Sequence, residues 1–515
     1  MQKFILTLLL CTVPSTLLAT DRVPNIIYIM ADDLGYGDLS CFGQTKFKTP
    51  NIDRLAAEGV TFTDYYAGST VCAPTRCVLM TGLHTGHAFV RGNREVQPEG
   101  QAPMPADIVT LPRRLQDAGY TTGMFGKWGL GAPGSASDPS NHFNEFFGYN
   151  CQRQAHTFYP THLWHNDQKV LLEEGVYSAD LINEKLLSFV KNNSDRPFFA
   201  YVPFTIPHAA MHVPEDDHAP FRAKWPQFDG KIGKYKGPLV TNPIAAFAGM
   251  MTRMDRHVGQ LLDLLKELGI DDNTIVSFTS DNGPHMEGGH DPKFFDSNGP
   301  LRGHKRDLYE GGIRVPFLAR WPGKITPGSV CNIPVAMWDV MPTCMEIAGV
   351  EPPKAIDGIS YLPALLGNEA DQPRHDYLYW AFYERGGKQA VRWGQWKGVR
   401  NNVGKNPDST LELYHLRSDL GEAVNVAAQY PEVVRRIDGY MRDAYTPSNC
   451  GLSVPLRTKR GDGFAVNTTA FVTSATGWCK DYITAHTVVS KSNNWSERTR
   501  FLQLAVWCKG QFRVL

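Results

Sequence analysis

One short stretch combines a nucleophile, a rigid backbone and a permanent cation. Cys72 lies two residues before Pro74 and four before Arg76. Pro74 fixes its own φ and biases Ala73 away from helix, so we expect Cys72 on a stiff, extended turn. The Arg76 guanidinium is a planar fork of donors that suits a sulfate or phosphate oxyanion. Taken alone, the stretch is more simply a buried cysteine near a helix start, with Arg76 in a surface ion pair.

Four oxygen-bearing side chains directly follow two apolar runs, 25–31 and 274–280, which we expect to be buried core strands. The four are Asp32, Asp33, Asp281 and Asn282. Adjacent carboxylates at the end of a buried strand repel each other unless a cation lies between them. An aspartate turn or an Asp-Asn-Gly turn explains either pair alone. The four together favour Ca²⁺ over zinc, because every ligand is an oxygen.

A lysine and a histidine also stand at expected strand ends. Lys127 closes the glycine-rich segment 120–126, whose glycines let the backbone approach a ligand closely. His208 follows the expected strand 196–203, and Pro207 stiffens its approach. An imidazole can donate or accept a proton near neutral pH. The simpler alternatives are a surface lysine and a core histidine bonded to the backbone.

These segments resemble the signatures of one enzyme family, the type I sulfatases. The stretch 72–76, followed by Thr81 and Gly82, is similar to the Cys-x-Pro-Ser/Thr-Arg signature. Segment 126–131 resembles the second signature, Gly-Lys-Trp-His-Leu-Gly, and segment 305–316 resembles a third conserved block. The similarity runs from about Pro24 to about Pro447, with the segments in the family's order.

The resemblance implies a fold, a reaction and a role for each matching residue. The fold is α/β, an alkaline-phosphatase-like mixed sheet flanked by helices. Cys72 is oxidised to formylglycine by the formylglycine-generating enzyme and also contacts Ca²⁺. Arg76, Lys127 and Lys305 hold the sulfate, and His208 protonates the leaving alcohol. The substrate is a sulfated carbohydrate or an aryl sulfate, and a sulfated galactose or N-acetylgalactosamine unit is expected.

The chain departs from the family pattern at Gly129, where the second signature has a histidine that contacts the formylglycine hydroxyl. We expect His156 to enter the site from a loop and take over that role. Arg153 and His304 are further candidates for substrate binding. The aromatic residues Tyr159 and Trp164, near the same loop, could line a sugar subsite, although an ordinary packed loop is about equally consistent with this segment.

The composition and hydrophobic pattern along the sequence divide the chain into four parts. We expect a signal peptide over 1–19, a catalytic domain over 20–370 and a small antiparallel subdomain over 371–447. Residues 448–515 show no clear period and have no structural prediction. Within these parts, helices are expected over 49–59, 110–119, 176–191 and 431–444, and subdomain strands over 377–382, 388–393, 396–400 and 411–415.

Composition limits the partners and the compartment. The net charge is zero at 515 residues, so no global field gathers nucleic acid or an anionic membrane. Lys3 and the short apolar core 4–11 read as a secretory signal, and no later run is long enough to span a bilayer. Ten cysteines fit an oxidising compartment. We therefore expect a secreted or periplasmic protein.

Two other functions fit the same residues. A phosphodiester or phosphonate monoester hydrolase would use the same site, because phosphoryl and sulfuryl groups share a tetrahedral shape. A secreted binding protein with a catalytically weak sulfatase fold gains weight from Gly129. Hydrolysis of a sulfate ester by formylglycine and calcium is the function that the pattern favours.

Overall fold

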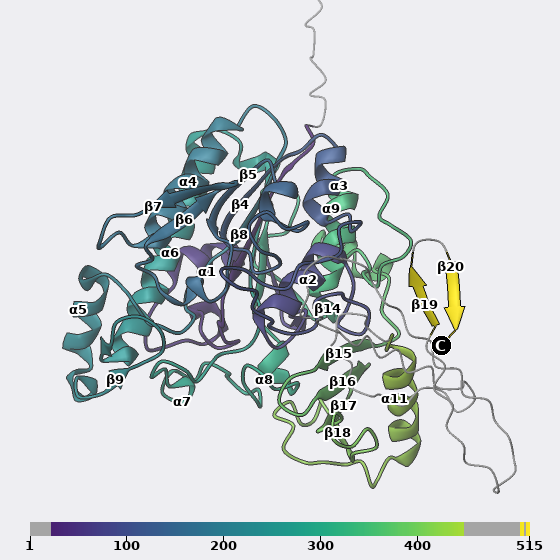
Figure 1. The fold of residues 1–515 in the computed structure, drawn as a ribbon. Helices are drawn as coiled ribbons and strands as arrows, with labels where there is room; N and C mark the ends of the chain where they lie inside the picture. Colours follow the sequence, from purple (N-terminus) through teal and green to yellow (C-terminus); the bar gives the residue numbers. More distant parts are fainter. Residues whose placement is uncertain (1–21, 447–504, 509–510, 515) are drawn as a thin grey trace, which may run out of the picture. The chain divides into compact units, whose positions relative to one another are not determined.

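The structure is a computed structural model that describes residues 22–446, 505–508 and 511–514 (Figure 1). The expected signal peptide lies outside these residues, as does most of the segment 448–515. The chain divides into two compact units, Met1–Leu456 and Arg457–Leu515. In the second unit, β19 (Ala505–Cys508) and β20 (Gln511–Val514) pair as an antiparallel hairpin.

A ten-stranded mixed sheet forms the centre of the larger unit. Its strands are β1 (Asn25–Ala31), β2 (Val60–Phe62), β4 (Thr121–Lys127), β5 (Glu145–Tyr149), β6 (His162–His165), β7 (Gln168–Leu171), β8 (Phe198–Pro203), β11 (Thr274–Ser280), β12 (Phe317–Arg320) and β13 (Ser329–Cys331). They lie in the order β13-β2-β12-β11-β1-β8-β4-β5-β6-β7. The central strands β11, β1, β8, β4 and β5 run parallel. Their carboxyl ends therefore meet at one edge of the sheet.

The central strand β1 is buried on both faces, as its continuous apolar run predicts. Alternate side chains point to opposite faces, so Tyr28 and Met30 join one hydrophobic core while Ile27 and Ile29 join the other. A one-residue register shift would exchange the two sets. Pairing with β11 runs without a bulge from Asn25 opposite Thr274 to Ala31 opposite Ser280.

Helices cover both faces of the sheet (Figure 1). The face with Tyr28 packs against α2 (Cys72–Thr81), α3 (Leu111–Asp117) and α9 (Val340–Ile347). The face with Ile27 packs against α1 (Pro50–Ala57), α4 (Ser178–Asn192) and α6 (Pro243–Glu267). None of the helices in the described ranges combines the length and apolar character that a bilayer span needs.

Shorter elements connect these layers. They are β3 (Tyr65–Tyr66), α5 (Glu215–Lys224), β9 (Ile232–Gly233), β10 (Val240–Thr241), α7 (Pro292–Phe295), α8 (Glu310–Ile313), β14 (Val335–Ala336) and α10 (Leu362–Leu365). The hairpin of β9 and β10 lies between α5 and α6 in the chain and becomes important at the site.

A separate four-stranded antiparallel sheet forms the C-terminal subdomain. Its strands are β15 (Leu378–Phe382), β16 (Lys388–Trp393), β17 (Trp396–Asn401) and β18 (Leu411–His415), in that order. Helix α11 (Pro431–Asp443) packs on it through Val433, Ile437 and Met441. The predicted fold class is confirmed in both parts, a helix-flanked mixed sheet followed by a small antiparallel sheet with one helix. The domain boundary near residue 370 stays a prediction.

Candidate active site

Cys72 is the first residue of α2, and all ten residues of this helix are buried. The predicted extended turn at Cys72 is therefore wrong. Val71, the residue before it, is extended with φ −152° and ψ 161°. Pro74 falls in the first turn, where helix N–H groups have no intrahelical partner, so proline is tolerated there.

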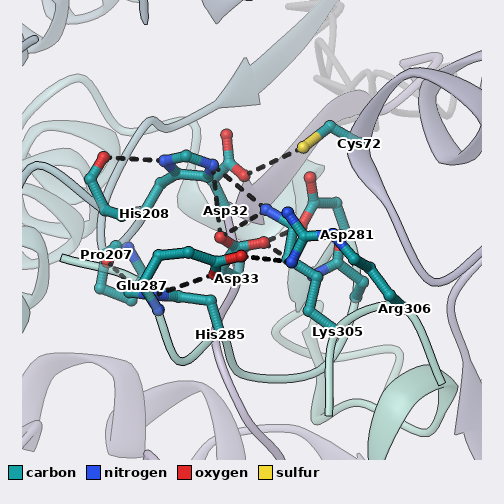
Figure 2. A network of polar contacts seen from close by, with 12 residues as sticks. Asp32, Asp33, Cys72, Pro207, His208, Asp281, His285, Glu287, Lys305 and Arg306 are labelled. Atoms are coloured by element: carbon teal, nitrogen blue, oxygen red, sulfur yellow. Dashed lines mark hydrogen bonds and ion pairs between the residues drawn. The ribbon is translucent and has the colours of Figure 1, made fainter. Parts of the chain in front are cut away.

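The four predicted oxygen ligands meet at the carboxyl ends of β1 and β11, and Figure 2 shows the three aspartates among them. The Asp33 backbone N–H donates to Asp281 Oδ1 at 3.0 Å. Asn282 Nδ2 donates to Asp33 Oδ1 at 2.7 Å. Asp33 has φ +67°, a left-handed conformation that is uncommon for a residue other than glycine. Backbone strain of this kind is concentrated at functional sites.

The Cys72 thiol lies beside these carboxylates. Its Sγ is 3.7 Å from Asp32 Oδ1. One possible ligand atom each from Asp32, Asp33, Cys72 and His208 fits within 4.8 Å, so the four residues could share a metal ion. Burial raises the pKa of Cys72 to about 12, even though Lys127 and Lys305 act to lower it. The unmodified thiol is therefore neutral near pH 7.

Two buried lysines neutralise the two adjacent aspartates. Lys127 Nζ lies 2.6 Å from Asp32 Oδ2, and Lys305 Nζ lies 2.7 Å from Asp33 Oδ2. Burial alone would lower the pKa of each lysine, but the facing carboxylate raises both above their ordinary value. Both lysines are therefore charged and can bind an anion near Cys72.

Arg76 lies deeper in the site than expected. Its Nη2 is 3.4 Å from both Asp32 Oδ2 and Asp281 Oδ2, and its Nη1 donates to the Lys127 carbonyl. The structure thus places Arg76 against the carboxylates that hold the site together. Its contacts orient Asp32, Asp281 and the end of β4.

The four predicted oxygen ligands include polar groups whose charge or hydrogen bonding a bound cation would satisfy. Burial, together with the neighbouring Asp32, raises the pKa of Asp281 to about 8. In the described part of the chain, Asn282 Oδ1 is buried without a hydrogen-bond partner. A buried carbonyl oxygen without a partner is costly unless a ligand takes it up. This donor set fits a hard divalent cation.

His208 faces the same cluster from the loop after β8 (Figure 2). Its Nδ1 lies 2.8 Å from the Ala209 carbonyl, so Nδ1 carries the proton in the neutral ring. Its Nε2 then accepts from Lys305 Nζ at 3.1 Å and lies 3.4 Å from Asp33 Oδ2. Burial and Lys305 hold the His208 pKa well below its usual range. His208 is a neutral imidazole whose free nitrogen points into the site.

His156 reaches the site, whereas two other candidates do not contact its charged groups. The His156 ring stacks on His208 with centroids 4.6 Å apart and an interplanar angle of 6°. Burial and the nearby Lys127 and Lys305 lower the pKa of His156. Arg153 instead pairs with Glu95 at 3.6 Å. The backbone N–H of His304 donates to Asp307.

The two aromatic candidates also have their contacts elsewhere. The Tyr159 ring packs against that of Tyr177, and Trp164 Nε1 donates to Glu99.

Gly129 has φ +76°, a conformation in which any side chain would be strained. A Cβ at this position would come within 2.7 Å of Gln152 Cγ. The position therefore has neither the backbone conformation nor the space for a histidine. Gln152 fills the space that the side chain at this position would need.

Two rings near the site, those of Tyr235 and His285, are not predicted from the sequence. The Tyr235 ring contacts the rings of His156 and His208, and the His285 ring stacks 6.0 Å from that of His208. The Arg306 guanidinium pairs with Glu287 beside Lys305 (Figure 2). His285 and Glu287 follow Asn282 closely, so their proximity could have been expected from the strand end. Tyr235 has no such local signal.

Comparison with known proteins identifies similar chains and folds. Residues 24–350 match the sulfatase family, and residues 303–444 match the C-terminal region of N-sulphoglucosamine sulphohydrolase. Human N-acetylgalactosamine-6-sulfatase is 30% identical over 482 residues, covering 84% of this chain and 88% of that protein. Bovine arylsulfatase A is 34% identical over 457 residues, covering 81% and 86%.

A solved structure agrees with these matches. The crystal structure of Ps i-CgsB in complex with k-i-k-neocarrahexaose aligns with a TM-score of 0.70 and 27% identity, covering 84% of this chain and 95% of that one.

Proposed function

The chain belongs to the sulfatase family and hydrolyses sulfate esters, and we propose that it acts on a sulfated carbohydrate through a formylglycine made from Cys72, with calcium bound beside it. One observation carries the proposal. Cys72 lies 3.7 Å from Asp32, and the Asp32 and Asp33 carboxylates are held by two buried lysines. Nucleophile, anion-binding cations and oxygen ligands thus meet at one sheet edge.

The Cys72 sulfur stands where a formylglycine oxygen would lie. A formylglycine at position 72 would supply a hydrated aldehyde with two hydroxyl groups, one to attack sulfur as the alcohol leaves and one to release the sulfate and restore the aldehyde. The raised pKa of the unmodified thiol supports the need for this change, since a neutral buried thiol is a poor nucleophile. A serine or cysteine lacks the second hydroxyl, so its sulfated form would be hard to clear.

Five groups of this chain would hold the calcium. They are Asp32, Asp33, Asp281, Asn282 and residue 72. Asn282 Oδ1 finds no hydrogen-bond partner among the described residues, and this and the raised pKa of Asp281 support the assignment. Bound calcium supplies positive charge that favours ionisation of a hydroxyl on residue 72.

The lysines and Arg76 stabilise the charge on the substrate. Lys127 and Lys305 lie on either side of the Asp32–Asp33 pair and can each donate to a sulfate oxygen. Such fixed donors in a water-poor site stabilise developing charge more strongly than donors in water. Arg76 keeps Asp32 and Asp281 in place while adding a third positive charge near Cys72.

His208 is the group that would protonate the leaving alcohol. Its Nε2 points into the site and accepts a hydrogen bond from the Lys305 ammonium, so it holds no proton until it takes one up, and the hydroxyl on residue 72 that attacks sulfur would supply that proton. A ring whose pKa lies below neutrality gives up a proton readily once it holds one. The bond from Nδ1 to the Ala209 carbonyl fixes the ring orientation during this transfer.

His156 is proposed to compensate for the family histidine that is missing at Gly129. It stacks on His208, and Lys127 and Lys305 act on its pKa, so it lies within range of the sulfate pocket. Its Nδ1 is buried without a hydrogen-bond partner in the described residues, which leaves one nitrogen for a ligand. Arg153 and His304 stay substrate-binding candidates only if the substrate extends beyond the sulfated unit.

The substrate class rests on the relatives. Human N-acetylgalactosamine-6-sulfatase is named for a sulfated amino sugar, and Ps i-CgsB was solved with a carrageenan-type hexasaccharide. We therefore propose a sulfated galactose or N-acetylgalactosamine unit, with aryl sulfates as artificial substrates. Maturation requires a formylglycine-generating enzyme as partner, and the sequence 1–20 supports a secreted or periplasmic location.

Two measurements test the proposal together. Mass spectrometry of the Cys72 peptide, from protein made with a formylglycine-generating enzyme, should show the aldehyde. The same protein should release sulfate from N-acetylgalactosamine 6-sulfate or galactose 6-sulfate, and Cys72→Ala should abolish this release without unfolding the protein. Full activity of Cys72→Ala, or of protein with an unmodified thiol, would falsify the formylglycine mechanism.

A further inference from the structure

The hairpin of β9 and β10 places one aromatic ring at the boundary between solvent and the catalytic residues. The Tyr235 ring lies 5.2 Å from the His156 ring at 75° and 5.7 Å from the His208 ring at 69°. It packs across both imidazoles, which are stacked with their planes nearly parallel. His208, Cys72 and Lys305 are buried, whereas Tyr235 is partly exposed.

Contacts on the C-terminal side of Tyr235 fix its position. Lys236 pairs with Glu95 at 3.9 Å, and Glu95 also holds Arg153. Gly237 has φ +79°, and a Cβ there would come within 2.9 Å of the His212 ring. His212 Nε2 in turn bonds to the Pro238 carbonyl at 3.1 Å. The hairpin is thus anchored to two other loops, and the ring has little freedom to move away from His208.

The position of the leaving group during the reaction indicates what Tyr235 would contact. His208 delivers a proton to the leaving oxygen, so the carbon skeleton attached to that oxygen must lie next to His208. Tyr235 is a partly exposed aromatic ring in contact with His208, and unlike the equally partly exposed His156 it carries no imidazole nitrogen. Burial raises its pKa above the ordinary value, so its hydroxyl stays neutral and adds no charge against an anionic substrate.

We propose that Tyr235 forms the binding surface for the leaving sugar, packing its ring against the apolar C–H face of a sulfated pyranose. The proposal rests on the proposed function and deepens it. Pyranose rings combine a polar rim with an apolar face, and aromatic rings provide a large, rigid contact area at low entropic cost. It also assigns to Tyr235 the sugar-binding role that the sequence suggested for Tyr159 and Trp164.

The test compares binding of the whole substrate with binding of sulfate alone. Tyr235→Ala should raise KM for N-acetylgalactosamine 6-sulfate about tenfold, with kcat changed less than threefold. The inhibition constant of inorganic sulfate, which has no leaving group, should stay within twofold of wild type. Tyr235→Phe keeps the ring and should match wild type. Tyr159→Ala is the control, since that ring packs on Tyr177 and His212 instead.

Each other outcome has a definite meaning. An unchanged KM in Tyr235→Ala overturns the inference. Equal rises in KM and in the sulfate inhibition constant also overturn it, because Tyr235 would then support the sulfate pocket. A KM for Tyr235→Phe as high as for Tyr235→Ala shows that the hydroxyl, and not the ring face, makes the contact. If wild-type protein with confirmed formylglycine hydrolyses neither sugar sulfate, the proposed substrate class fails and Tyr235 is not the cause.

Discussion

Two buried clusters of charged residues in this protein have the same composition and opposite uses. The catalytic cluster contains three carboxylates and three cations, namely Asp32, Asp33, Asp281, Arg76, Lys127 and Lys305. The subdomain cluster also contains three of each, namely Asp64, Glu310, Glu422, Arg314, Arg392 and Lys397. Burial and charge balance alone therefore do not separate the two.

The electrostatics of the two clusters are similar in detail. Lys397 lies 2.6 Å from Glu310, as Lys127 does from Asp32. Each cluster also contains one carboxyl group whose pKa burial raises to about 8, Asp281 in one and Glu422 in the other. Perturbed pKa values point to functional sites only as a tendency, and the subdomain cluster shows why.

The partners of the charges separate the two clusters. Glu310 is surrounded by groups of the protein itself, since Tyr66, Arg314 and Lys397 all donate to its carboxylate. The cluster joins α8 and the loop after β2 to the C-terminal sheet. The catalytic cluster instead lies where parallel strands end, beside a thiol and two imidazoles. It is arranged for a ligand, and the subdomain cluster is arranged for the fold.

Replacing Lys127 and Lys397, one in each cluster, tests most directly whether the two clusters have different roles. Lys127→Met should lower kcat/KM for a sugar sulfate about 10³-fold, because a fixed donor to the sulfate oxygens is lost. The urea unfolding midpoint, measured with calcium present, should change little, because Arg76 and calcium still balance Asp32. A loss of activity below tenfold would show that Lys127 does not contact the transferring group.

Lys397→Met should have the opposite result. Removing Lys397 leaves Glu310 and Glu422 buried with fewer cations, which costs about 3 kcal/mol of unfolding free energy. Arg314 and Arg392 remain, so we expect the low end of the range for a broken buried pair. Urea denaturation followed by circular dichroism measures the loss. The folded fraction should keep kcat within threefold of wild type, and a kcat loss like that of Lys127→Met would remove the distinction between the clusters.

The sequence located the catalytic cluster and missed the subdomain cluster for a physical reason. Asp32 and Asp281 directly follow strands whose apolar runs are visible locally, Lys127 is the last residue of β4, and parallel strand ends converge at one edge. Glu310 and Arg314 are four positions apart in the chain and pair at 3.3 Å, so this contact is local. Lys397 and Glu422 join that pair only through the docking of a second sheet, which no local pattern encodes.

The errors at the site have similar origins. Cys72 was expected on an extended turn because Pro74 disfavours helix at Ala73, but the first turn of a helix tolerates proline. Tyr235 was missed because its hairpin has strands of only two residues each and no catalytic motif. It reaches the site through packing against His208, 27 positions earlier in the chain.

Calcium should act on one cluster and leave the other unchanged. Saturating calcium, at about a hundredfold over its dissociation constant, should stabilise the protein by about 2–3 kcal/mol relative to EDTA-treated protein. Thermal unfolding with and without calcium measures this as a rise in Tm. Asn282→Ala should reduce the rise, whereas the Lys397→Met protein, although less stable, should respond as wild type does. An equal response in Asn282→Ala would argue against Asn282 as a ligand.

The smallest expected effect concerns Glu422, whose pKa is raised from 4.5 to about 8 in the folded protein by burial and by Glu310. A carboxyl group with a raised folded-state pKa stabilises the fold at low pH, and this stabilisation is lost as the pH rises toward 8. Glu422→Gln keeps an acceptor for the Glu310 N–H, which now bonds at 2.7 Å, and has no charge to lose.

Between pH 7 and pH 8, wild type should therefore lose about 1 kcal/mol of unfolding free energy relative to Glu422→Gln. Urea denaturation of both proteins at each pH, with calcium present throughout, measures the difference. Asp281 is common to both proteins, so its own titration cancels in the comparison. Parallel stability curves for the two proteins would mean that Lys397, 3.9 Å away, keeps Glu422 ionised across this range.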